Sequence, residues 1–179
     1  MKGRKIFYQS RRAILFGGIV LFVGIVFFVT KTSNESVLFQ EDLQSTQERV
    51  EVKRVIDGDT IELSDGRRVR YIGIDTPEKG YEKEKKDECF AYQASEKNRN
   101  LVEGKNVELL KDISATDKYG RLLRYVFVEG ELVQEELLRE GYADVLTIPP
   151  DVRNAKSFRE LRDLAREEKR GLWGACEIE

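Results

Sequence analysis

Residues 55–78 read VIDGDTIELSDGRRVRYIGIDTPE, and this stretch predicts two short strands near the start of the domain. Two short apolar runs, 61–63 and 69–74, are separated by residues 64–67 (SDGR), a sequence typical of a hairpin turn. Acidic residues lie before the first run, in the turn and after the second run. The stretch therefore predicts a β-hairpin with acidic side chains at its ends.

Pairing the two runs brings the carboxylates of Asp59 and Asp75 to one end of one sheet. Two close carboxylates repel each other unless they share a proton or bind a cation. The chain has no histidine, and neither cysteine lies in this stretch, so oxygen ligands favour a hard cation such as Ca²⁺ over zinc. Arg70 adds a guanidinium that can bind a phosphate through two hydrogen bonds. Each residue alone fits an ordinary turn or helix start, but together they predict a site for a metal and a phosphate.

Three segments resemble the motif blocks of the staphylococcal nuclease (thermonuclease) family: 55–60 (VIDGDT), 69–78 (VRYIGIDTPE) and 117–121 (DKYGR). They occur in the family's order and at similar spacing, and the resemblance covers roughly residues 50–175. It implies an α+β fold, namely a five-stranded Greek-key β-barrel of the OB type with three helices. It also implies a calcium-dependent endonuclease that hydrolyses DNA and RNA with little sequence specificity, prefers single strands, leaves 3′-phosphate products and works as a monomeric domain.

The same resemblance implies a calcium site and a carboxylate for the attacking water. Asp59 and Asp75 match the side-chain ligands of the family, and Thr76 matches a residue whose backbone carbonyl completes the protein's share of the site. Glu78 matches the carboxylate that positions or activates the water. All four residues of this implied set are present.

Two arginines complete the implied catalytic set. Arg70 and Arg121 match the pair that holds the scissile phosphate and stabilises the charge of the pentavalent transition state, and Tyr119 matches a substrate-binding tyrosine. The chain departs from the family at residues 145–150 (VLTIPP), where other tyrosines of the nucleotide pocket are missing. We expect weaker base stacking as a result, by about 1 to 3 kcal/mol for each lost aromatic contact.

The remaining residues predict alternating helices and strands. The expected elements are a helix at 89–102, strands at 105–113 and 121–128, a helix at 132–141, an edge strand at 142–146 and a helix that begins between 154 and 157. The last helix carries Phe158, Leu161, Leu164 and Ala165 on one face, which predicts core packing. Five strands with three helices, one of them between strands three and four, fit an OB-type barrel.

The N-terminal part of the chain has a different composition. Residues 13–30 (AILFGGIVLFVGIVFFVT) are uncharged and long enough to cross a bilayer. Lys and Arg precede them and acidic residues follow soon after Lys31, so the positive-inside rule predicts a cytoplasmic segment 1–12, a transmembrane helix and a C-terminal part outside the cytoplasm. A cleaved secretory signal is the alternative, but the run does not end in an Ala-x-Ala site. Both interpretations place the domain outside the cytoplasm.

Residues 31–49 are polar and show little periodicity, which predicts a linker ahead of a domain at 50–176. From Val50 onward the chain carries 24 Lys and Arg against 29 Asp and Glu, a net charge of −5. Nucleic-acid-binding surfaces are normally basic, so binding by this domain needs a local basic groove, a metal ion or both. Lysines in the loop after Glu78 are candidates for phosphate contacts, and a solvated loop without a specific task is the alternative. These lysines are Lys79, Lys83, Lys85 and Lys86.

Cys89 and Cys176 are the two cysteines of the chain. A location outside the cytoplasm is oxidising, so the sequence predicts a disulfide between them. Two separate buried thiols are the alternative.

The function also has an alternative of a different class. The alternative is a non-catalytic OB module, tethered at the cell surface, that binds nucleic acid or another ligand there. The complete set of metal-ligand, carboxylate and arginine positions favours the enzyme over this binding module.

Overall fold

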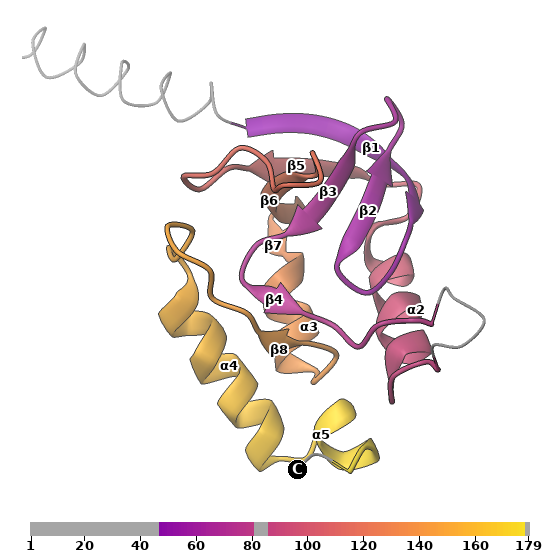
Figure 1. The fold of residues 1–179 in the computed structure, drawn as a ribbon, viewed down its shortest axis with the longest axis vertical. Coiled ribbons are helices and arrows are strands. Elements are labelled where there is room, and N and C mark those ends of the chain that lie inside the picture. The colour runs from indigo at the N-terminus through magenta and orange to yellow at the C-terminus, as the bar shows by residue number, and fades with distance from the viewer. Residues whose placement is uncertain (1–46, 81–85, 178–179) are drawn as a thin grey trace, which may run out of the picture. The chain divides into compact units, whose positions relative to one another are not determined.

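The computed structural model describes residues 47–80 and 86–177. Figure 1 shows the barrel strands toward one end of this domain and the helices α2, α3 and α4 toward the other. The elements in chain order are β1 Gln47–Val55, β2 Thr60–Leu63, β3 Arg68–Tyr71, β4 Ile74–Asp75, α2 Ala91–Val102, β5 Asn106–Leu110, β6 Leu122–Val128, β7 Glu131–Leu132, α3 Val133–Arg139, β8 Asp144–Val145, α4 Ala155–Glu167 and α5 Leu172–Ala175.

Five of the strands close into a barrel. They pair in the order β3-β2-β1-β5-β6, and β3 also pairs with β6 to complete the ring. This closing pair is parallel, with Val69 opposite Leu122 and Arg70 opposite Leu123, whereas the other pairs of the ring are antiparallel. The predicted α+β class and five-stranded barrel with three main helices are confirmed. The set of strands differs from the prediction, because β1 belongs to the barrel, whereas the predicted edge strand at 142–146 corresponds to β8, which pairs with β4 in a separate two-stranded sheet.

β1 serves both halves of the barrel. Its first half pairs with β5 and its second half pairs with β2, and the register shifts between Val52 and Arg54. A bulge of this kind bends a strand and increases its twist, which helps a small sheet to close. The strand begins at Gln47, so its first three residues belong to the segment 31–49 that the sequence predicts as a linker.

Side chains of β3 alternate between the barrel interior and its outer face. Val69 and Tyr71 are buried in the core, whereas Arg68 and Arg70 lie on the opposite face of the strand. The Tyr71 hydroxyl donates a hydrogen bond to Asn98 Oδ1 on α2 at 2.9 Å. This buried contact joins the barrel to α2, while the arginines remain available on the other side.

α4 packs on the domain through a narrower face than the sequence predicts. Phe158 is fully buried, and its ring lies edge-on to Tyr125 with 6.2 Å between the ring centroids. Ala165 is buried and Leu161 is partly buried, but Leu164 is 51% exposed. The prediction that Leu164 packs in the core is wrong, because the contact follows the i, i+3, i+7 positions of the helix only.

The predicted strand at 69–74 is interrupted. β3 ends at Tyr71, and Gly73 adopts a φ of 84°, which favours glycine and turns the chain. Asp75 then lies on β4, where it is paired with Asp144 of β8. The sequence predicts that Asp59 and Asp75 lie at one end of a single hairpin. This prediction is wrong, because Asp75 belongs to β4, which pairs with β8. The predicted strands at 105–113 and 142–146 are likewise shorter, as β5 and β8 show.

The predicted membrane anchor at 13–30, the segment 1–12 and most of the predicted linker lie outside the described residues. Within residues 47–80 and 86–177, no helix combines the length and the apolar character that a membrane span needs.

Candidate active site

A close backbone contact brings the first and second motif segments together. A Cβ atom at Gly58 would lie 2.4 Å from Thr76 Oγ1, so only glycine permits this approach without displacing Thr76. The neighbouring Asp59 accepts the Thr76 N–H at 3.0 Å through Oδ2 and the Thr60 hydroxyl at 3.1 Å through Oδ1. Residues from the loop before β2 and from the end of β4 thereby form one site.

Asp59 is the buried centre of this site, with 1% of its surface exposed. Burial raises the pKa of its carboxyl group, the Arg70 guanidinium lowers it, and the negative charge of Asp57 raises it further. The pKa of Asp59 is raised overall, because the effect of lost hydration is larger than the opposing effect of the Arg70 guanidinium. Asp57 Oδ1 also accepts the Asp59 N–H at 3.1 Å. The ionised form of Asp59 thus requires additional positive charge close by.

Arg70 supplies positive charge to two carboxylates at once. Its Nη1 forms an ion pair with Asp59, and its Nη2 donates a hydrogen bond to Asp75 Oδ1 at 2.6 Å. Nη1 is buried and has no hydrogen bond of normal geometry within the part of the chain that the structure describes. A single guanidinium therefore bridges the two acidic residues that the sequence predicts as metal ligands.

The available donors fit a hard divalent cation. Asp59 and Asp75 offer carboxylate oxygens, and Thr76, which contacts Asp59, offers a backbone carbonyl. Among the described residues, no three or more Asp, Glu, His or Cys side chains gather into a metal site. Ca²⁺ takes six to eight oxygen ligands and accepts water among them, so two carboxylates and a carbonyl would supply part of its coordination shell and water the rest.

Glu78 is half-buried at the start of the loop 79–87. Its backbone N–H donates to Glu88 Oε2 at 2.9 Å, and its carbonyl accepts the Glu88 N–H at 3.0 Å. A third hydrogen bond, from Gly80 N–H to Asp87 Oδ1 at 2.8 Å, lies just beyond this pair. These contacts close the base of the loop and fix the backbone that carries the Glu78 carboxylate.

Arg121 is held by the turn that precedes β6. Its Nε donates to Asp117 Oδ2 at 2.7 Å, and its N–H donates to Asp117 Oδ1 at 3.0 Å. Burial raises the pKa of Asp117, but the Arg121 side chain and the backbone N–H groups of Arg121 and Tyr119 outweigh burial and lower it overall. The Arg121 guanidinium carbon also lies 5.6 Å from the centre of the Tyr119 ring. Asp117 thus stays ionised and orients the guanidinium.

A cleft of about 440 Å³ brings the predicted substrate residues together. Arg70, Tyr119 and Arg121 all line it. Leu146, Ile148 and Pro149 form part of its wall, at positions where the sequence predicts that family tyrosines are missing. The cleft therefore combines two arginines suited to phosphate with Tyr119 and with aliphatic groups at the positions of the missing tyrosines.

The predicted phosphate-binding lysines are only partly described. Lys83 and Lys85 lie outside the described residues, Lys86 is exposed, and Lys79 Nζ lies 5.5 Å from the centre of the Tyr92 ring. The Lys79 side chain thus lies against Tyr92 of α2, and Lys79 is not among the residues that line the cleft of Arg70 and Arg121.

A disulfide joins Cys89 to Cys176, whose Cα atoms are 5.9 Å apart. Cys89 lies just before α2, one residue after Glu88, and Cys176 follows α5. The bond therefore attaches the C-terminal end of the domain to the base of the loop that begins at Glu78.

Three residues that shape the site had no role in the sequence prediction. Asp117 orients Arg121, Glu88 holds the backbone of Glu78, and Asp57 contacts Asp59. The short Asp-to-Arg spacing in 117–121 is a local signal that an ion pair closes this turn. Glu88 gave no comparable signal, because its partner lies ten residues away across a loop.

Comparison with known proteins agrees with this arrangement. A family model described as Staphylococcal nuclease homologue matches residues 68–175. The chain is 32% identical over 168 residues to Thermonuclease of Staphylococcus intermedius, which covers 90% of this chain and 98% of that protein. It is 39% identical over 132 residues to Endonuclease YncB and 38% identical over 132 residues to SPbeta prophage-derived endonuclease YokF, both of Bacillus subtilis (strain 168). These two alignments cover 69% of this chain but only 61% and 43% of the respective relatives. The resemblance predicted from the three motif segments is confirmed, and the chain belongs to the staphylococcal nuclease family.

Proposed function

We propose that the protein is a calcium-dependent endonuclease that hydrolyses phosphodiester bonds of DNA and RNA, prefers single strands and leaves 3′-phosphate products. The observation that carries this proposal is the position of Arg70. It lines a cleft together with Arg121 and also contacts Asp59 and Asp75. The names of the relatives, which are thermonuclease and endonuclease, support a nuclease.

The residues of the site match the needs of phosphodiester hydrolysis. Such a reaction requires an activated water, stabilisation of charge on the phosphate and an in-line arrangement. Calcium, when bound, would neutralise charge on the scissile phosphate. Arg70 and Arg121 donate hydrogen bonds to phosphate oxygens, for which their planar guanidinium groups are suited. Glu78 orients the attacking water or accepts its proton.

The bridge between Arg70 and the two carboxylates has a consequence for substrate binding. Asp59 and Asp75 hold both Nη atoms of Arg70. Arg70 becomes available to a phosphate when another positive charge stands between these carboxylates. Metal binding and phosphate binding by Arg70 are therefore expected to be cooperative.

The test is a cleavage assay with the full chain purified in detergent. Single-stranded DNA and RNA are each incubated with calcium chloride or with a chelator. We expect cleavage only with calcium, 3′-phosphate ends on the products, and a rate loss of roughly 10² to 10³ in Arg121→Gln. Arg159→Gln, at an exposed arginine of α4, is the control and should cleave like the wild type. Nucleic-acid binding without cleavage in calcium would contradict the proposal and favour the non-catalytic module.

We propose in addition that residues 13–30 anchor the protein in the cell membrane, with the nuclease domain outside the cytoplasm. The uncharged length of this run and the positive charges before it support the proposal. Protease added to intact cells should remove the domain. A domain that is degraded only after the cells are lysed would reverse the topology, and a domain found free in the medium would indicate a cleaved signal.

A further inference from the structure

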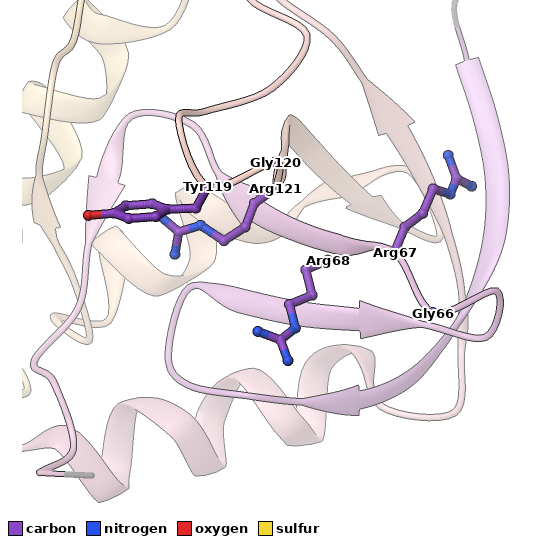
Figure 2. A pocket seen from close by; sticks show the side chains of 6 residues that line it. All are labelled: Gly66, Arg67, Arg68, Tyr119, Gly120 and Arg121. Atoms are coloured by element: carbon purple, nitrogen blue, oxygen red, sulfur yellow. The ribbon is translucent and has the colours of Figure 1, made fainter. Parts of the chain in front are cut away.

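A second hollow, of about 570 Å³, adjoins the active-site cleft on the outer face of the barrel (Figure 2). The residues that line it come from the turn after β2, from the start of β3 and from the turn before β6. They are Gly66, Arg67, Arg68, Tyr119, Gly120 and Arg121. Tyr119 and Arg121 also line the active-site cleft, so the two hollows meet at these side chains.

The three arginines of the second hollow differ in their partners. Arg67 pairs with Glu48 and with Asp65, and Figure 2 shows its side chain extending away from Arg68 and Arg121. Arg121 pairs with Asp117.

Arg68 is the exception among these arginines. It is exposed and forms no ion pair or side-chain hydrogen bond with any residue of the described ranges 47–80 and 86–177. It therefore carries the uncompensated positive charge of this hollow, in a domain whose net charge from Val50 onward is −5.

The strands place Arg68 in line with the two arginines of the active site. Arg68 and Arg70 lie on the same face of β3, two residues apart, a rise of roughly 6.6 Å. β3 pairs with β6 so that Val69 is opposite Leu122, and the same register, continued by one residue, places Arg68 beside Arg121 at the end of the turn that precedes β6. Adjacent strands are about 4.8 Å apart. Arg68 thus lies next to Arg121 and two residues before Arg70, and it is the one of these three arginines without a carboxylate partner among the described residues.

We propose that Arg68 binds a backbone phosphate of the substrate strand beyond the scissile phosphate. This inference rests on the proposed function and extends its substrate site onto the outer face of β3. A backbone contact of this kind adds affinity for a polynucleotide without selecting a base sequence. Tyr119, which is 72% exposed where the two hollows meet, lies between the proposed scissile site and this second phosphate.

The experiment compares Arg68→Gln with Arg159→Gln in the full chain. Arg159 is the matched control, because it is an exposed arginine on α4 without an ion pair to any described residue. One series measures kcat/KM in calcium on a 20-nucleotide single-stranded DNA and on a dinucleotide that contains only the scissile phosphate. A second series measures binding of the same fluorescent 20-mer by anisotropy in a chelator, where cleavage cannot occur.

For Arg68→Gln we expect kcat/KM on the 20-mer to fall roughly fivefold to tenfold at about 50 mM salt and less than about twofold at 0.5 M salt. On the dinucleotide it should equal that of the wild type. In the binding series, the slope of log affinity against log salt should decrease by about 0.7, the value for one phosphate contact on a single strand. Arg68→Lys should restore the slope, since a positive charge is sufficient for this contact, and Arg159→Gln should leave every quantity unchanged.

The two series separate this inference from the proposed function. Cleavage by the wild type with no difference between Arg68→Gln and Arg159→Gln would overturn the role of Arg68 and leave the nuclease intact. A chain that binds the 20-mer through Arg68 but never cleaves it would support the phosphate contact and contradict the nuclease. An equal loss on the dinucleotide and on the 20-mer would also overturn the inference, because it would place Arg68 at the scissile phosphate itself.

Discussion

Asp117 Oδ2 accepts a hydrogen bond from Arg121 Nε at 2.7 Å, while its other oxygen accepts the backbone N–H groups of Tyr119 and Arg121. One carboxylate thus folds the turn and orients the guanidinium that this turn carries. Nε is used for orientation, so the two Nη groups are left for a phosphate. Asp117 is therefore a positioning residue for the proposed reaction.

The first prediction concerns this ion pair. Asp117→Asn keeps an oxygen for the backbone of the turn but loses the charge that fixes Arg121. For Asp117→Asn we expect kcat to fall by roughly tenfold with little change in KM. For Arg121→Lys we expect kcat to fall further, by roughly 10². Steady-state kinetics on single-stranded DNA measure both values.

A matched control exists on the hairpin after β2. Asp65 makes the same contacts to Arg67, with Oδ1 accepting the Arg67 N–H at 3.0 Å and Oδ2 accepting Nε at 2.7 Å. Asp65→Asn should leave kcat within about twofold of the wild type. If Asp117→Asn and Asp65→Asn behave alike, Asp117 has no special role in turnover.

The second prediction concerns the carboxylate assigned to water. Glu78→Gln should lower turnover by roughly 10² or more at saturating calcium and DNA, since it removes a general base or an orienting acceptor. The fold should persist, because the contacts between Glu78 and Glu88 that close the loop use the Glu78 backbone. Circular dichroism and the calcium affinity should therefore match the wild type. Normal turnover in Glu78→Gln would reject this role for Glu78.

The third prediction concerns metal binding, measured by thermal unfolding rather than by activity. A ligand that binds only the folded state stabilises it by about 2.7 kcal/mol at a concentration of 100 times its Kd. Calcium should raise the melting temperature of the wild type and of Asp65→Asn. In Asp59→Asn this increase should be largely lost, because the site loses its buried carboxylate. An increase of the same size in Asp59→Asn would place calcium elsewhere.

The fourth prediction concerns stability at low pH. Hydrogen bonds from Arg54 and Lys53 lower the pKa of Glu62 from an ordinary 4.5 to about 2. The folded state therefore binds this proton more weakly than the unfolded state does. The stabilisation is present in full above pH 4.5 and is lost as the pH falls toward 2.

Denaturant unfolding between pH 2 and pH 7 tests this prediction with Glu62→Gln. The variant should be less stable than the wild type at neutral pH, and the difference should shrink below pH 4.5. Glu160→Gln is the control, because Glu160 is exposed and its nearest ion-pair partner, Lys156, is 3.9 Å away. A stability difference that does not change with pH would show that Glu62 does not stabilise the fold through its charge.

The fifth prediction concerns the bond between Cys89 and Cys176. Thiol labelling in denaturant without reductant should find no free thiol. Reduction should lower the free energy of unfolding by roughly 4 to 5 kcal/mol in the chain-entropy model, because the bond closes a loop between residues 87 positions apart. The double variant Cys89→Ser with Cys176→Ser should be insensitive to reductant. Two titratable thiols in the untreated protein would exclude the disulfide.

Local sequence patterns predict much of the fold. The turn at 64–67, the alternation on β3 and the helices α2, α3 and α4 depend on residues close together in the chain, so short stretches encode them. The three motif segments likewise predicted the family.

The arrangement of the site depends on contacts between distant segments. The turn at Gly73 removes Asp75 from the predicted hairpin, yet Arg70 still bridges Asp75 to Asp59. Choice of ion-pair partner depends on which side chains the whole fold brings near, so no local pattern could assign Arg70 to these carboxylates.

The position of Arg68 likewise depends partly on local sequence and partly on contacts between distant segments. The sequence shows an arginine at the start of a strand, and alternation alone places it on the face of Arg70. Only the parallel pairing of β3 with β6, between segments about 50 residues apart, places it beside Arg121. The sequence determined which side chains each strand presents, and the tertiary structure determined which of them meet, because strand register is set by packing across the whole barrel.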